Sequence, residues 1–146
     1  LVYDTTDGSV VSTDVATDIL NFNESFVIVP RDDEVSILQQ EMKKRIESWG
    51  IDPRDYPKIS VRIVARGYAT DRRAILEALN LGFEGFKYFK DEGPKIDELF
   101  TSSDRQLNAI AEKTMKLIDE LDWHFDGDEP AREQVKTAAL SVIYGD

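Results

Sequence analysis

The chain has 146 residues, of which 41% are hydrophobic and 32% are charged, and its formal net charge is −11. This length fits one domain, and the hydrophobic content argues against a wholly disordered chain. The sequence has no cysteine, which excludes disulfides, thiolate zinc sites and a cysteine nucleophile. The acidic balance argues against a protein whose whole surface coats nucleic acid. We expect one domain over residues 1–146, with no cofactor and no metal.

The charge is distributed unevenly along the chain. Residues 1–30 contain five acidic residues and no Lys or Arg, and residues 96–146 contain 12 acidic and five basic residues. The central residues 31–95 are nearly neutral, with 13 basic and 12 acidic residues. Within them, residues 58–90 hold seven Lys or Arg against three acidic residues. This basic stretch is where contacts with an anion or with nucleic acid are expected.

Targeting signals are not evident in the sequence. No basic segment followed by an apolar run opens the chain, so no secretion signal is expected. No uncharged run is long enough to span a membrane, so we expect no membrane partner. The expected location is the cytoplasm or the interior of a macromolecular assembly.

The first predicted element is a polar hairpin arm over residues 1–24. Asp7-Gly8 is a strong tight-turn pair between segments rich in Val and Thr. A hairpin of this size is not stable alone, so it either packs on the domain or pairs with another chain.

The segment 25–100 is predicted to form a core of sheet and helices. The apolar run Phe26–Val29 predicts a buried strand, and the period-two pattern of residues 59–66 predicts a second one. Between them, apolar residues at helical spacing predict a helix over 33–49, capped by Asp32 or Asp33. The order strand, helix, strand predicts a crossover with the two strands parallel.

The remaining helices are predicted from caps and apolar faces. One helix is expected over 70–81, capped by Thr70 or Asp71, and residues 83–90 are interpreted as a short helix, with a third strand as the alternative. Residues 101–146 are expected to form an antiparallel helix pair at about 103–122 and 129–143, with Ser102 or Ser103 and Asp128 as caps. The predicted fold class is α+β, in which a small mixed sheet that includes the N-terminal hairpin is packed by helices.

The first candidate site is the turn in residues 65–73. A Gly after a strand, then a capped helix start, is an arrangement that binds anions, because the first N–H groups of the helix point outward. The candidate ligand residues are Arg62, Arg66, Thr70, Arg72 and Arg73. The turn lacks the spacing of the known phosphate-binding loops, and the alternative is a capped helix with solvated or ion-paired arginines.

A second candidate overlaps the first. Ala78, Gly82 and the flanking Leu81 and Phe83 have the spacing of a tight turn between two helices. With them, residues 72–93 resemble a helix-turn-helix DNA-binding unit. The resemblance implies that 86–90 is the DNA-reading helix and that Lys87 and Lys90 contact DNA. Glu77 and Asp91 stand where that family has apolar residues, and Gly85 weakens the second helix.

Acidic and aromatic groups supply the other candidates. Asp122, His124, Asp126 and Asp128 alternate, but they do not match a calcium loop and are interpreted as a polar loop between helices. The acidic residues of 104–133 are candidates for a negative face that imitates the DNA backbone, against the alternative of a solvated helix face. Four clustered aromatics are candidate interface residues: Phe83, Phe86, Tyr88 and Phe89.

These observations favour a non-enzymatic protein-interaction or assembly function, such as an adaptor or structural component of a virus or another macromolecular complex. The sequence carries no catalytic constellation that we recognise, and an enzyme is the less favoured class. The expected partner is another protein or further copies of the chain. The alternatives are nucleic-acid binding through residues 62–90, an acidic DNA-mimic inhibitor, and a small-molecule or phosphate-ester enzyme that uses the turn at 65–73.

Overall fold

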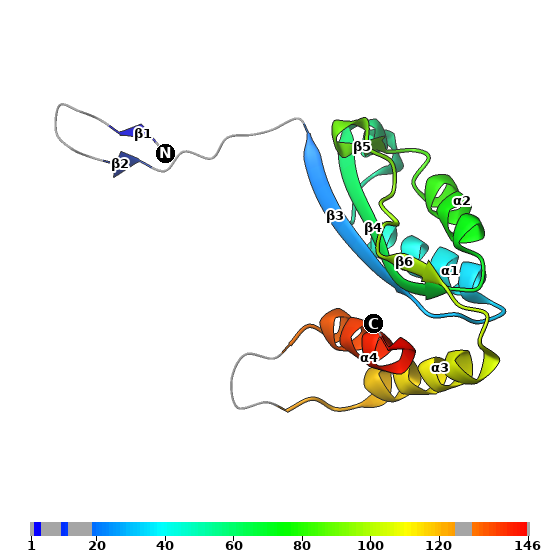
Figure 1. The fold of residues 1–146 in the computed structure, drawn as a ribbon. Coiled ribbons are helices and arrows are strands. Elements are labelled where there is room, and N and C mark those ends of the chain that lie inside the picture. Colours follow the sequence, from blue (N-terminus) through cyan, green and yellow to red (C-terminus); the bar gives the residue numbers. More distant parts are fainter. Residues whose placement is uncertain (1, 4–9, 12–18, 125–129, 146) are drawn as a thin grey trace.

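The computed structural model describes residues 2–3, 10–11, 19–124 and 130–145. The fold combines helices with a small open sheet, in agreement with the predicted α+β class (Figure 1). The helices predicted over 33–49, 70–81, 103–122 and 129–143 are present with shifted ends. They are α1 (Glu34–Ser48), α2 (Arg72–Gly82), α3 (Arg105–Glu120) and α4 (Arg132–Tyr144), with short 3-10 turns η1 (Pro53–Lys58) and η2 (Phe89–Asp91).

The sheet is built around β4 (Ile59–Ala69). On one side β4 pairs with β3 (Leu20–Ile28) in parallel, from Leu20 opposite Ile59 to Ile28 opposite Gly67. On the other side it pairs in parallel with β5 (Lys87–Tyr88) near its start and with β6 (Leu99–Thr101) near its end. β5 and β6 therefore share one edge of β4, with a single bridge from Val64 to Lys95 between them.

The prediction of a mixed sheet that includes the hairpin is wrong. β1 (Val2–Tyr3) and β2 (Val10–Val11) pair antiparallel with each other as a separate two-stranded sheet, whereas all the pairs made by β4 are parallel. The physical reason is that α1 and α2 each return the chain to the starting edge, as parallel neighbours require. The predicted crossover from the first strand to the second is confirmed.

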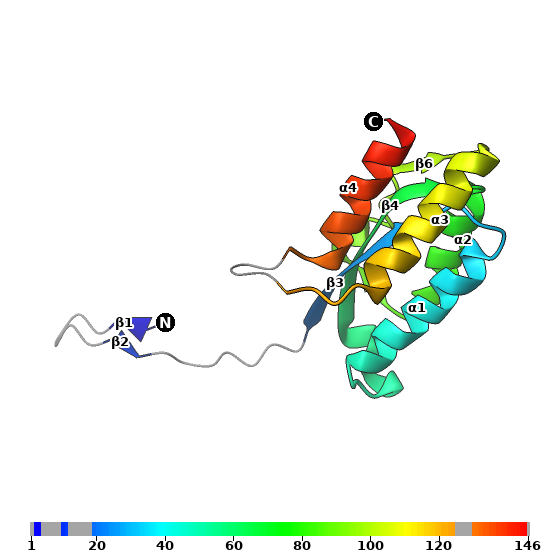
Figure 2. The same cartoon turned by 90° about the horizontal axis from the view of Figure 1, so that it is seen from below.

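The helices cover the two faces of the sheet unequally (Figures 1 and 2). α1 and α2 cover one face and enclose the larger core, which we call the first core. It includes Phe26, Leu38, Ile63, Ile75 and Phe83, each at most 2% exposed. On the opposite face α3 and α4 lie side by side and enclose the second core, formed by Tyr68, Ala111, Met115, Ile118 and Leu140.

Gly67 lets β3, β4 and α4 approach closely. Its φ of +101° lies in the region that glycine adopts readily and other residues do not. A Cβ at this position would lie 2.5 Å from the carbonyl oxygen of Ile28 and 3.0 Å from Leu140 Cδ1. The end of the central strand therefore requires a residue without a side chain.

Residues 83–90 do not form the short helix predicted for them. Phe83 follows the end of α2, Lys87 and Tyr88 form β5, and η2 follows. Pairing with Ser60 and Val61 of β4 holds Lys87 and Tyr88 extended, which agrees with the alternative of a third strand, so tertiary contacts rather than local propensity decide the structure there. The reading helix of the helix-turn-helix prediction is therefore not formed.

The helix starts differ in part from the expected caps. Asp71 caps α2 as predicted, and its carboxylate accepts hydrogen bonds from the N–H groups of Arg73 and Ala74. Asp104, not Ser102 or Ser103, caps α3. Asp33 precedes α1 without a side-chain capping bond, because its carboxylate pairs with the Arg31 side chain instead. The predicted cap Asp128 lies outside the described residues.

Candidate functional site

The seven cationic or polar residues predicted to bind an anion or nucleic acid separate into two groups. Thr70, Arg72 and Arg73 lie at the start of α2, at the carboxyl-terminal edge of the sheet. The other four lie on or next to the sheet face opposite α1 and α2: Arg62, Arg66, Lys87 and Lys90. The structure therefore does not bring the predicted set together as one site.

The start of α2 binds a carboxylate that belongs to the protein. Glu34 is 6% exposed, and its carboxylate accepts hydrogen bonds from the Thr70 N–H at 2.9 Å, the Thr70 hydroxyl at 2.8 Å and the Asp71 N–H at 3.0 Å. The Arg31 N–H donates to the same carboxylate at 3.3 Å. The anion expected at this turn is thus an internal one, contributed by the first turn of α1.

The two arginines of this turn are engaged locally. Arg72 donates to the carbonyl oxygen of Ile96 at 2.8 Å, and Arg73 forms an ion pair with Glu77 at 3.1 Å. Sequence reasoning missed Glu34, because the residue lies 36 positions before Thr70. The predicted parallel pairing of the two strands could have indicated this contact, because the carboxyl ends of neighbouring parallel strands meet at one edge of a sheet.

The amino-terminal half of the second sheet face forms an open surface. Along β4, Ile59, Val61 and Ile63 point into the first core, so the intervening residues point to the other side. The parallel register places residues of β3 and β5 on the same face. We define the open face by Asn21, Asn23, Ser25, Ser60, Arg62, Val64, Arg66 and Lys87, with Phe89, Lys90 and Lys95 beside them.

Cations and one aromatic ring meet at the border of the open face. The Arg62 guanidinium lies over the Phe89 ring, with 4.6 Å between Cζ and the ring centroid, and Lys90 Nζ lies 5.5 Å from the same centroid. Glu92 pairs with Lys95 at 2.8 Å. The hydrogen bond and charge of Lys95, with smaller contributions from Lys90 and Arg62, hold the pKa of the Glu92 carboxyl below its usual value.

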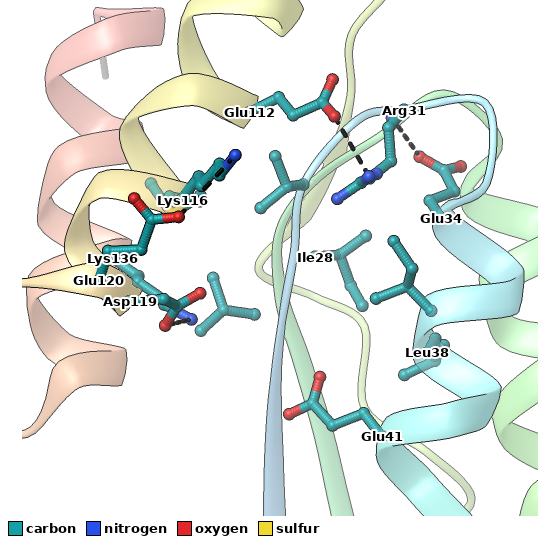
Figure 3. A pocket seen from close by; sticks show the side chains of 14 residues that line it. Ile28, Arg31, Glu34, Leu38, Glu41, Glu112, Lys116, Asp119, Glu120 and Lys136 are labelled. Carbon is teal, nitrogen blue, oxygen red and sulfur yellow. Dashed lines mark hydrogen bonds and ion pairs between the residues drawn. The ribbon is translucent and has the colours of Figure 1, made fainter.

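A groove lies at the carboxyl-terminal end of the free edge of β3 (Figure 3). Within the described residues β3 has β4 as its only partner strand, so its outer edge presents unpaired backbone groups. The groove has a volume of about 510 Å³, and Val27, Ile28 and Val29 form its floor. α1 and α3 form its walls with apolar and charged side chains, namely Ile37, Leu38, Glu41, Glu112, Met115, Lys116, Asp119 and Glu120.

Two arginines connect the helical layers across this edge. Arg31 pairs with Glu112 of α3 at 3.1 Å, as Figure 3 shows at one end of the groove. Farther along, Arg45 of α1 pairs with Glu24 at 2.9 Å and with Glu133 of α4 at 2.7 Å. Burial alone would lower the pKa of Arg45, but the hydrogen bonds that its guanidinium donates to the carboxylates of Glu24, Glu133 and Glu41 outweigh burial and raise that pKa above its ordinary value.

The carboxyl-terminal edge of the sheet, where ligands of parallel sheets commonly bind, also contains a hollow, of about 760 Å³. Its main polar groups pair with one another. The Ser102 hydroxyl donates to Asn108 Oδ1 at 2.7 Å, and the Tyr144 hydroxyl donates to the same atom at 2.7 Å. Arg31 binds Asp33 beside it. Among the described residues of its lining, Asp32, Ser103 and Arg105 form no ion pair or side-chain hydrogen bond, so the free groups include both a cation and a carboxylate.

The other sequence candidates are dispersed or enclosed. Among the described residues no group of three or more His, Cys, Asp or Glu is arranged to hold a metal ion. The pair Asp122 and His124 is exposed, whereas Asp126 and Asp128 lie outside the described residues. Phe83 and Phe86 are buried in the first core, which removes them from the accessible surface.

The acidic residues of α3 are largely ion-paired. Glu112 binds Arg31, Asp119 binds Lys136 at 2.6 Å, and Glu120 lies 3.8 Å from Lys116. The negative face proposed as a DNA mimic is thus locally balanced by positive charge.

Comparisons with protein-family models, curated proteins and solved structures find no match to this chain. In the part of the chain that the structure describes, no helix has the length and apolar character needed to cross a membrane. Two surfaces of the described residues remain as candidate binding sites, the groove at the edge of β3 and the open face.

Proposed function

We propose that this chain is a non-enzymatic assembly protein in which copies of the chain associate through the free edge of β3. The observation that carries this proposal is a nine-residue strand that has one partner strand among the described residues and whose last residues, Val27 and Ile28, lie at the floor of a groove. Such an edge binds an extended segment through main-chain hydrogen bonds.

The proposed occupant is the N-terminal hairpin of a second copy. β1 and β2 pair with each other and are separate from the main sheet in the described residues. A two-stranded hairpin is marginally stable at best in water, so it gains stability by adding to a larger sheet. In the described residues, the chain therefore contains a two-stranded pair outside the main sheet and a main sheet with an unpaired edge at β3.

Electrostatics gives this association an unusual salt dependence. The groove lining holds five carboxylates and three cationic side chains, and the sequence of residues 1–11 contains two acidic residues and no Lys or Arg. The occupant and the groove thus repel each other weakly, and added salt screens that repulsion. We expect association to become stronger, not weaker, as the salt concentration rises.

Size-exclusion chromatography with light scattering over a range of protein concentrations tests the proposal. We expect a mass above that of the monomer which increases with concentration. Ile37→Lys places a charge on the groove wall at a half-buried position, and Val10→Pro removes a backbone donor from β2. Each substitution is expected to give a monomer.

The matched control is Ile110→Lys, the same substitution at an exposed position of α3 outside the groove. This control is expected to associate like the unmodified chain. A chain that stays monomeric at every concentration, or an equal loss of association in Ile37→Lys and Ile110→Lys, would contradict the proposal.

A further inference from the structure

We propose that the open face of the sheet binds single-stranded nucleic acid, a function separate from self-association along β3. This surface brings together four of the seven residues predicted from the basic stretch of the sequence. Arg62, Arg66, Lys87 and Lys90 all lie on it or at its border, together with Lys95. The ligand class follows from the charge, the aromatic ring and the shape of this face.

The positive charge of the open face is available to a ligand. In the described part of the chain, Arg62, Lys87 and Lys90 form no ion pair with a carboxylate, whereas Arg66 pairs with Glu98 and Lys95 pairs with Glu92. Three unpaired cations on one face of a protein with net charge −11 form a local positive site. Such a site attracts a polyanion and orients it before contact.

The aromatic ring distinguishes nucleic acid from other polyanions. The Arg62 guanidinium already lies over the Phe89 ring, and its other side is a surface against which a base can pack. Sheet faces that combine cations with stacking groups bind unpaired bases, because every base has an apolar face. A phosphate polymer without bases would use the cations alone.

The shape of the face favours a single strand over a duplex. The segment expected to enter a DNA groove as a helix is instead the strand β5 and the turn η2. Beside the cations, a hollow of about 590 Å³ lies between α4 and the strands β3 and β4. Its α4 wall includes the small side chains of Thr137, Ala138 and Ser141, and its two carboxylates, Glu24 and Glu133, both pair with Arg45. This space accommodates a splayed base more readily than a rigid double helix.

Fluorescence anisotropy with a labelled oligothymidylate of roughly 15 nucleotides tests the proposal, since this length covers the site size of a small sheet domain. We expect binding with a dissociation constant on the order of micromolar at low salt. With about three phosphate contacts, the logarithm of affinity should fall against the logarithm of salt with a slope of about −2. Added salt should therefore weaken nucleic-acid binding, whereas it should strengthen self-association.

Paired variants separate the site from general electrostatics. The double substitution Arg62→Ala with Lys90→Ala removes two exposed cations from the face and is expected to weaken binding about tenfold or more. The control, Lys44→Ala with Lys113→Ala, makes the same change in net charge at exposed positions on α1 and α3. It is expected to change affinity by less than about threefold.

Phe89→Leu tests the stacking contribution, because it retains an apolar side chain but removes the ring. We expect weaker binding of the oligonucleotide and unchanged binding of heparin, a polyanion without bases. Circular dichroism melting confirms that each variant is folded. The proposal is overturned by no binding at low salt, by equal losses in the two double variants, by tighter binding of duplex than of single strand, or by equally effective competition from polyglutamate.

Discussion

The two faces of the sheet are made from the same strands but have different properties. The face under α1 and α2 is closed. The rings of Phe83 and Phe86 pack against Trp49 and against each other, and Phe26 packs against Phe83, at centroid distances of 5.4–6.4 Å. The opposite face is covered at its carboxyl-terminal half by α3 and α4, and its remaining half is polar and cationic. The difference indicates that one face supplies most of the stability, which leaves the other free to carry charge.

The largest expected effect comes from truncating each core. Phe83→Ala removes a fully buried ring from the first core, and it should lower the free energy of unfolding by about 3–5 kcal/mol. Met115→Ala in the second core should cost about 2 kcal/mol, because this site borders the groove and can relax. Urea denaturation at constant m-value measures both. Equal losses would show that the two faces contribute alike.

The next effect concerns the internal carboxylate at the edge of the first face. Glu34→Ala leaves the N–H groups of Thr70 and Asp71 without their acceptor, and we expect a loss of about 2–3 kcal/mol in unfolding free energy. Glu34→Gln keeps one acceptor oxygen and should lose less. Glu47→Ala, an exposed glutamate of the same helix, is the control and should change stability by less than about 0.5 kcal/mol. If Glu34→Ala behaves like this control, the internal anion has no structural importance.

Removing two buried tyrosine hydroxyls, one on each face of the sheet, is expected to raise stability by a smaller amount. Within the described residues the hydroxyls of Tyr68 and Tyr88 are buried without a hydrogen-bond partner. Tyr68→Phe and Tyr88→Phe should each raise stability by up to about 1 kcal/mol, since they remove an unsatisfied polar group. Tyr144→Phe should lower it by about 1 kcal/mol, because that hydroxyl donates to Asn108. Thermal melts that give one sign for all three variants would refute this assignment.

The smallest expected effect is a shift in the pKa of Glu92, a carboxyl group at the border of the open face. Lys95 lowers the pKa of the Glu92 carboxyl from its ordinary value of 4.5, so this pair contributes stability above that value and loses the contribution as the pH falls through the lowered pKa. Lys95→Ala should return the pKa of Glu92 towards 4.5. Carbon-13 NMR of the glutamate carboxyls measures this shift. Lys44→Ala, distant on α1, should leave it unchanged.

The candidate sites were less predictable than the helices. Apolar spacing located α1 to α4 because each helix buries a continuous stripe, and such a stripe is visible in a single segment. The strand character of residues 20–24 was missed, since Asn21, Asn23 and Glu24 lie on an edge strand whose side chains reach solvent or Arg45. A polar edge strand lacks the apolar pattern from which strands are predicted.

The sites also required knowledge of which distant residues meet. Positive charge identified four residues of the open face, namely Arg62, Arg66, Lys87 and Lys90. The sequence placed them in one predicted site with Arg72 and Arg73, because all six lie within one basic stretch. Strand alternation and the pairing of β5 with β4 placed the first four on or beside one face. The sequence predicted Phe89 only as one of four aromatic interface residues. In the structure its ring lies beneath the Arg62 guanidinium.

The sequence by itself determined the helices, the parallel crossover from β3 to β4 and the location of the basic stretch, because periodicity and charge are local properties. The tertiary structure decided the segment at 83–90, the internal carboxylate at α2 and the exposure of the edge of β3. Each of these depends on contacts between residues far apart in the chain. Glu34 reaches Thr70, and Lys87 pairs beside Ser60, only after parallel strands bring their ends together.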